Sequence, residues 1–349
     1  MKNKRKLLLP FLSVAFLVLL GLFFLLPLPY FIESPGPIAN LNSFVHVEGK
    51  TDDFSGSFNI TTVRERQATP FFLLRAKLTP FNDINTRQEV LGDQTTAEYN
   101  QMNVFFMRSS QNAAKVQALR LAGRKSEAVF KGVYVMSVNP QSDFASELSV
   151  GDIVTAVDGN NFTSSQEMIT YIRALEVGQE VKVSFTSGGE HREASGKLME
   201  LPGTNFPGIG ISLVDNTQIT SDINITYEAG GIGGPSGGLM LTLETYTKLT
   251  GRDLRNGQKI AGTGTMDFDG NVGRIGGIDK KVVSASREGA SVFFAPDDQI
   301  SEEARKANPD IQSNYEEAVA TAKQINTSMK IVPVRTAQDA IDFLESMKE

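Results

Sequence analysis

Residues 230–238 read Gly-Gly-Ile-Gly-Gly-Pro-Ser-Gly-Gly, so one hydroxyl group, that of Ser236, lies among six glycines and a proline. The apolar run at 239–246 predicts a buried helix that ends at Gly251. Free backbone N–H groups at a helix N-terminus favour a developing negative charge. Ser236 is therefore a candidate nucleophile, and the alternative is an ordinary serine in a tight turn.

Composition limits what the chain can do. Its 349 residues allow two folded domains, and its net charge of −6 argues against a nucleic-acid partner. The absence of cysteine excludes thiol catalysis and Cys-ligated zinc. With only His46 and His191 available, we expect no metal site and no cofactor.

The N-terminus has the pattern of a membrane anchor. A basic tail at 1–6 precedes an apolar run at 7–32, which is long enough to span a bilayer. A cleaved signal peptide is the alternative, but no small-residue cleavage site follows the run. We expect an uncleaved, single-pass anchor in the cell membrane. The N-terminus would be cytoplasmic and the rest of the chain extracellular.

Residues 126–200 form a self-contained pattern. A strand at 132–138 is followed by the motif L-S-V-G-D-I-V-T-A-V-D-G at 148–159, a helix that ends at Leu175, and a strand at 181–185. This order resembles a PDZ domain, which binds an extended peptide as an added strand. The resemblance implies that the backbone N–H groups of Gly132, Val133, Tyr134 and Val135 hold the peptide. Recognition of a chain end or of an internal strand stays open, and the alternative is a β domain that only spaces its neighbours.

The flanking regions complete an α+β, multidomain chain. Before residue 126, a strand at 56–63 and a helix at 96–122 are predicted, with a methionine-rich stripe that we assign to core packing. Beyond residue 201, strands alternate with helices. The predicted strands are 209–214, 223–227, 260–266, 292–294 and 331–334; the predicted helices follow Gly277, cover 315–324 and begin at Ala337.

The base that would activate Ser236 is expected to be a lysine, although a chymotrypsin-like order could recruit His46 or His191. Residues 234–238 satisfy G-x-S-x-G, but α/β-hydrolases of that pattern need a histidine after the serine, and none follows here. His191 lies in a charged tip and is expected in solvent. Lys281 lies at the edge of the apolar helix face that contains Ile278 and Val282. A desolvated lysine can act as a base. The alternative is that the aliphatic part of the Lys281 side chain packs against the protein while its amine reaches solvent.

Lys280, the neighbour of Lys281, points nearly opposite to it on the predicted helix and is expected in solvent.

Ser236 in G-P-S-G-G, Thr263 in T-G-T and Lys281 in G-G-I-D-K-K resemble the proteolytic domain of Lon proteases. The order of anchor, PDZ-like part and Lon-like part resembles the membrane-anchored PDZ–Lon-like serine proteases of Gram-positive bacteria.

That resemblance implies a Ser–Lys dyad, with Ser236 as the nucleophile, Lys281 as the general base, and Thr263 orienting the lysine amine. It also implies that backbone at the turn, with Gly234 and Gly237 as candidates beside Ser236, holds the oxyanion. Gly237 departs from the alanine that is usual after the family's serine. The sequence contains no G-x-x-x-x-G-K-[ST] loop, so ATP-independent cleavage of peptides or unfolded segments is expected.

The expected organisation has five parts: a cytoplasmic tail (1–6), a transmembrane anchor (7–32), a segment that packs with the protease domain (33–125), a PDZ domain (126–200) and a Lon-type proteolytic domain (201–349). The expected partners are peptide or unfolded protein substrates and the lipid bilayer, and a homo-oligomer stays open. A surface PDZ scaffold without catalysis is the alternative function.

Overall fold

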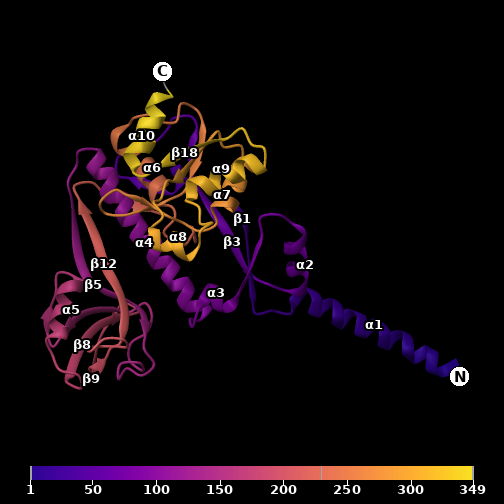
Figure 1. Cartoon of the computed structure of the whole chain (residues 1–349), viewed down its shortest axis with the longest axis horizontal. Helices are drawn as coiled ribbons and strands as arrows, with labels where there is room; N and C mark the ends of the chain where they lie inside the picture. Colours follow the sequence, from indigo (N-terminus) through magenta and orange to yellow (C-terminus); the bar gives the residue numbers. More distant parts are fainter. Residues whose placement is uncertain (1, 229, 348–349) are drawn as a thin grey trace.

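The computed structural model describes residues 2–228 and 230–347, with side chains described from residue 11 onward. Helix α1 (Lys2–Leu25) projects from the body of the molecule, and a separate lobe lies on the other side (Figure 1). Among the described residues, no helix combines the length and the apolarity needed to cross a membrane. The predicted span of 7–32 is also too long, because the helix ends at Leu25 and a strand begins at Tyr30.

A mixed six-stranded sheet forms the centre of the body, in the order β18-β17-β14-β3-β1-β4. Its strands are β1 (Tyr30–Asn40), β3 (Ser57–Gln67), β4 (Asp83–Thr86), β14 (Lys259–Gly262), β17 (Val292–Pro296) and β18 (Lys330–Val334). Strand β14 runs parallel to both β3 and β17, whereas β1 is antiparallel to β3 and β4. Segment 33–125 therefore shares one sheet with the C-terminal part of the chain.

Helices make up the rest of the body around this sheet. They are α2 (Pro70–Leu78), α3 (Arg87–Leu91), α4 (Thr96–Leu121), α6 (Gly238–Thr250), α7 (Ile278–Arg287), α8 (Glu302–Ala307), α9 (Asn314–Gln324) and α10 (Ala337–Ser346). Helix α4 begins with a capping box of Thr95 and Glu98, which satisfies backbone N–H groups at its start. Helix α6 is buried on almost every side, so the main core forms around the helix that follows Ser236.

Short elements complete the body. A 3-10 turn, η1 (Leu41–Ser43), leads to β2 (Val45–Val47), which pairs with β13 (Ile225–Tyr227). Strands β15 (Thr265–Met266) and β16 (Val272–Gly273) form a hairpin around residues 267–271.

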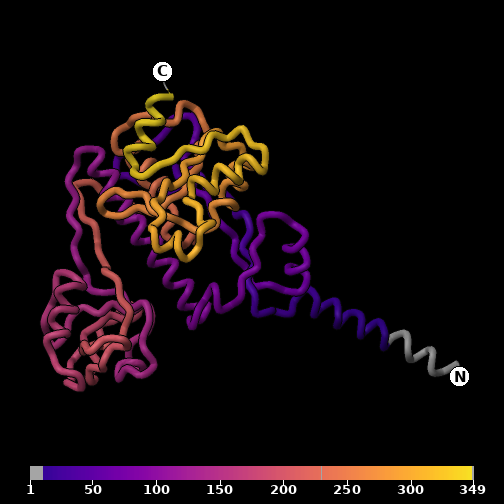
Figure 2. Tube along the Cα trace, in the orientation of Figure 1, coloured from indigo at the N-terminus to yellow at the C-terminus, as the bar shows by residue number. Residues whose placement is uncertain are grey.

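The separate lobe is a second sheet of order β12-β5-β6-β8-β9, with β7 beside β6. It contains β5 (Ser126–Val138), β6 (Ile153–Val157), β7 (Asn160–Asn161), α5 (Ser165–Arg173), β8 (Glu180–Ser187), β9 (Glu190–Lys197) and β12 (Ile211–Ser221), with β10 (Met199–Glu200) paired to β11 (Pro207–Gly208). Two long chain segments, β5 and β12, join the lobe to the body (Figure 2). The strand predicted at 209–214 thus belongs to this lobe, not to the C-terminal sheet, because β12 pairs with β5.

Candidate active site

Ser236 and Lys281 lie together. Ser236 is half-buried in the turn before α6, and Lys281 projects from the first turn of α7. The distance from Lys281 Nζ to Ser236 Oγ is 2.8 Å. This is hydrogen-bonding distance, so a proton can pass directly between the two groups.

Lys281 is buried, with 3% of its surface exposed. Burial lowers the pKa of Lys281 to about 7, and the negative charge of Glu33 opposes this shift. A lysine with this pKa is neutral in a large fraction of molecules near pH 7 and can accept a proton. The alternative in which the Lys281 amine reaches solvent is therefore wrong.

Thr263 lies in the break between β14 and β15 and is completely buried. Lys281 Nζ is 3.0 Å from Thr263 Oγ1, which in turn donates to the carbonyl oxygen of Ser236 at 3.0 Å. The Gly264 N–H donates to the same carbonyl at 2.9 Å. The Thr263-Gly264 segment therefore fixes both the lysine amine and the backbone of the serine.

Helix α4 supports the serine turn from the other side. The carbonyl oxygen of Asn103 accepts the N–H of Gly234 at 2.9 Å, and Ser110 Oγ donates to the carbonyl of Pro235 at 2.9 Å. The predicted oxyanion role of Gly234 needs correction, because its N–H is already engaged. Sequence reasoning missed Asn103 and Ser110, since polar residues in a long amphipathic helix carry no signal of a distant partner.

Gly237 is the N-cap of α6 with φ −93°, a conformation open to any residue. A Cβ atom here would lie 2.3 Å from Ile60 Cδ1 on β3. The constraint on this position is therefore steric and comes from Ile60, not from the backbone.

The sequence predicts that Lys280 lies in solvent, and the structure shows that this prediction is wrong. It is 2% exposed, and its amine contacts Asp83 at 2.5 Å and Asp279 at 3.1 Å. Burial alone would lower its pKa, but hydrogen bonds and the charges of Asp83 and Asp279 hold the pKa of Lys280 above its usual value. The prediction failed because strand β4, which supplies Asp83, is remote in sequence from α7.

His191 lies exposed in the β8–β9 hairpin, as predicted. In the part of the chain that the structure describes, no three His, Asp or Glu side chains are arranged to hold a metal ion.

The predicted peptide-binding strand has no free edge. At Val133, Tyr134 and Val135, β5 pairs with β12 on one side, and at Val133 and Tyr134 it pairs with β6 on the other. A peptide therefore cannot add at Gly132–Val135, and this prediction is wrong.

A small groove lies instead between α5 and the β11–β12 segment. It encloses about 140 Å³ and is lined mainly by apolar side chains, among them Met168, Ile169, Ile172, Ile211 and Leu213. Strand β12 is terminal in the sheet order, and its residues Ile211 and Leu213 line this groove.

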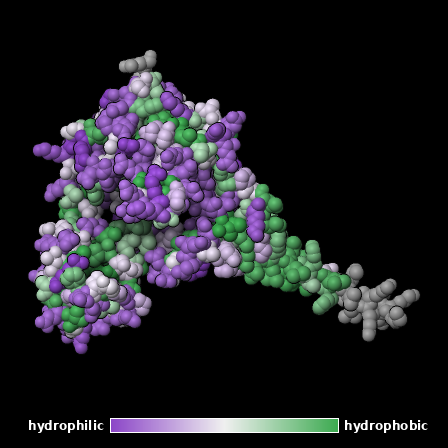
Figure 3. All heavy atoms as spheres, viewed as in Figure 1, coloured by the Kyte–Doolittle hydropathy of each residue, from purple (hydrophilic) through white to green (hydrophobic). Residues whose placement is uncertain are grey.

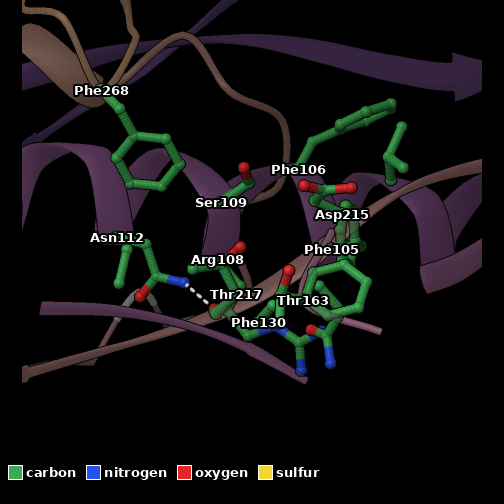
Figure 4. A pocket seen from close by; sticks show the side chains of 13 residues that line it. Phe105, Phe106, Arg108, Ser109, Asn112, Phe130, Thr163, Asp215, Thr217 and Phe268 are labelled. Atoms are coloured by element: carbon green, nitrogen blue, oxygen red, sulfur yellow. Dashed lines mark hydrogen bonds between the residues drawn. The ribbon is translucent and has the colours of Figure 1, made fainter. Parts of the chain in front are cut away.

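A larger cavity of about 500 Å³ is lined by residues of the lobe and of the body, and Figure 4 shows these side chains. Phe106 and Phe268 contribute to its walls, and the cavity does not include Ser236 or Lys281. Beside it, Asn112 Nδ2 donates to the carbonyl of Thr217 at 2.7 Å and Arg108 donates to Asn216 at 3.1 Å. Helix α4 thus contacts both the serine turn and β12 of the lobe.

Two family models match the chain. Residues 92–198 match the PDZ domain, and residues 208–342 match the Lon protease (S16) C-terminal proteolytic domain. Both matches confirm the domain types predicted from the sequence.

Curated relatives are similar over part of the chain. The Lon protease of Mycoplasma pneumoniae is 41% identical over 78 residues, which are 22% of this chain and 10% of that protein. The Lon protease of Acinetobacter baumannii is 29% identical over 149 residues, which are 42% of this chain and 18% of that protein. The chain therefore spans about a tenth to a fifth of the length of these relatives.

Among solved structures, the PDZ domain of an SdrC-like protein from Listeria monocytogenes is 45% identical. The match covers 24% of this chain and 90% of that one, with a TM-score of 0.24. The family matches and the Lon relatives lead to one conclusion: the chain carries a PDZ domain followed by a Lon-type proteolytic domain, the domain of a serine endopeptidase.

Proposed function

We propose that this protein is a membrane-anchored endopeptidase that cleaves extracellular peptides or unfolded protein segments with a Ser–Lys dyad and without ATP. The observation that carries the proposal is the 2.8 Å contact between Lys281 Nζ and Ser236 Oγ inside a buried site.

In the proposed reaction, neutral Lys281 takes the proton of Ser236 Oγ as the oxygen attacks the scissile carbonyl. The protonated amine then gives this proton to the leaving nitrogen, and an acyl-enzyme remains on Ser236. In the second half, Lys281 takes a proton from water, which attacks the acyl group, and returns it to Ser236 Oγ. Thr263 keeps the lysine amine in line during both halves.

The oxyanion would lie at the start of α6, where the helix dipole and backbone N–H groups favour negative charge. The N–H of Ser236 is the main candidate donor. The N–H of Gly234 could serve only after leaving the carbonyl of Asn103.

The proposed anchor is α1, with the N-terminus in the cytoplasm. Large apolar side chains along its described part, such as Phe11, Leu17 and Leu25, are exposed, and Figure 3 shows a hydrophobic surface along the helix. On the adjacent α2, Leu74 and Leu78 are exposed as well. Exposed apolar surface of this extent is costly in water and is typical of lipid contact.

The PDZ domain would select substrates through the α5–β12 groove. An extended peptide can pair with the outer edge of β12 and place side chains against Ile169 and Ile211. Without an unfolding motor in this sequence, the preferred substrates are flexible peptides and exposed tails.

The test uses the full chain in detergent or vesicles with unstructured peptides. Cleavage by the wild type and its loss in both Ser236→Ala and Lys281→Ala support the dyad. Equal cleavage by all three proteins would exclude it. Peptide binding without cleavage by the wild type would instead favour the scaffold function.

A further inference from the structure

Three carboxylates lie side by side across the sheet beneath α7. Glu33 on β1 is paired in register with Glu65 on β3 and with Asp83 on β4. Like charges in directly opposed cross-strand positions repel one another. Tyr99 donates a hydrogen bond to Glu65 at 3.2 Å, which leaves Glu33 and Asp83 for another partner.

That partner is Lys280. Its amine lies 2.5 Å from Asp83, 3.1 Å from Asp279 and 3.9 Å from Glu33, and the side chain is almost fully buried. One cation therefore balances carboxylates from two strands and one helix at the start of α7.

Glu33 connects this cluster to the dyad. Burial raises the pKa of the Glu33 carboxyl and Lys280 opposes that rise, while the charge of Glu33 raises the pKa of Lys281. Glu33 also lies against the N-terminus of α7, because its Oε1 is 2.4 Å from the position that a Cβ of Gly277 would occupy. A change in the charge around Glu33 thus acts on the lysine base.

We propose that Lys280 is a positioning residue of the dyad: by neutralising Glu33 and its neighbouring carboxylates, it keeps Lys281 free to act as a base near neutral pH. This inference rests on the proposed function. It assigns a role in the site to the segment before the PDZ domain, since Glu33 and Asp83 both lie in that segment.

Two other charged groups act on the cluster, and neither supplies the positive charge that neutralises Glu33. Glu317 on α9 faces Asp279 and Lys280, and burial raises its pKa. Arg274 acts on Glu317 and pairs with Asp298 at 2.6 Å, so its charge is already balanced. Lys280 is the cation in direct contact with β1 and β4.

The test compares pH profiles of kcat/KM for the full-length wild type, Lys280→Gln, Glu33→Gln and the double variant. Loss of the Lys280 charge should move the midpoint upward by about one pH unit. From a wild-type pKa of about 7, this reduces kcat/KM about fivefold at pH 7 and leaves it almost unchanged at pH 9.5. Glu33→Gln should move the midpoint downward, and the double variant should lie between the two.

A purely structural role for Lys280 predicts a different result, namely an equal loss at every pH. Such a loss, or a profile that coincides with that of the wild type, overturns the proposal. If Lys280→Gln does not fold, the downward shift in Glu33→Gln decides, and its absence overturns the proposal.

A second readout is independent of cleavage. In a Ser236→Ala background, NMR titration of ¹³C-labelled lysine follows Lys281 directly, with Lys281→Arg used to assign its signal. Addition of Lys280→Gln should raise the Lys281 midpoint, and an unchanged midpoint would overturn the proposal. If the wild type cleaves nothing but the midpoint shifts, the proposed function fails and the role of Lys280 stands.

Discussion

The hydroxyl oxygen of Thr263 accepts a hydrogen bond from Lys281 Nζ at 3.0 Å. The same hydroxyl donates its proton to the carbonyl of Ser236, so it can act on the amine only as an acceptor. A neutral amine that donates to Thr263 has its lone pair available for the proton of Ser236. The threonine therefore sets the direction of proton transfer as well as the position of the lysine.

Replacement of Thr263 by Val should lower kcat about 100-fold with little change in KM, because the amine loses its orienting partner. Thr263→Ser keeps the hydroxyl group and serves as the matched control, with activity close to that of the wild type. Steady-state kinetics on one peptide measures both. Equal activity of the Val and Ser variants would show that the hydroxyl has no part in the reaction.

The pH dependence of kcat/KM should follow the lysine base. Because the pKa of Lys281 is lowered to about 7, activity should rise as pH increases through about 7 and then reach a plateau. Lys281→Arg should be inactive at every pH, since arginine keeps its proton. A profile that stays flat from pH 5 to 9 would contradict a lysine base.

The buried Lys281 should also lower the free energy of unfolding at neutral pH. Its folded pKa lies below the unfolded value, so between about pH 7 and 10.5 the unfolded chain binds more protons and stability rises with pH. Lys281→Met should unfold at higher denaturant concentration at pH 7, with a gain of about 2 kcal/mol after the two lost hydrogen bonds are counted. Urea titrations at pH 7 and 9.5 test this, and the gain should shrink at the higher pH.

Gly237→Ala should strain the packing against β3. The new Cβ would lie 2.3 Å from Ile60 Cδ1, the end of that side chain, so Ile60 must leave its rotamer, at a cost of about 1 kcal/mol in the free energy of unfolding. The double variant Gly237→Ala/Ile60→Val removes that methyl group and should recover most of the loss. Thermal unfolding of the two variants gives the comparison. If the double variant is no more stable than the single one, Ile60 is not the constraint.

The α5–β12 groove should matter for long substrates only. Ile169→Lys places a charge in the groove and should weaken binding of long peptides about tenfold or more, without changing the cleavage of short ones. Thr170→Lys, at the next and exposed position, is the control. Binding and cleavage of a peptide series of increasing length measure the effect. If the substitution reduces the cleavage of long and short peptides equally, the groove does not act by binding the peptide.

The proximity of Ser236 and Lys281, on which the proposed dyad rests, could be predicted because the signals that identify the two residues are local. A glycine-rich turn identified Ser236, helix periodicity placed Lys281 on a buried face, and a short motif gave Thr263. The contacts that hold them are not local: Asn103 and Ser110 lie more than a hundred residues before the turn they support. Sequence spacing carries no information about such pairs.

The order of the strands in the sheets was the other feature that the sequence did not predict. Alternating residues correctly predicted a strand near 209–214, but an apolar strand does not indicate which sheet it joins. Its pairing with β5 occupies the edge at Val133–Val135, so the peptide groove that we propose lies beside β12 instead. The burial of Lys280 was missed for the same reason, because β1 and β4 reach α7 only in three dimensions.

The connection between α1 and β1 is short. Only residues 26–29 separate Leu25 from Tyr30, and two of these four are prolines. Fully extended, four residues reach about 14 Å. With α1 in a bilayer, as proposed, the protease body would have a short and stiff tether. It could then cut only chains that come within a few nanometres of the lipid surface.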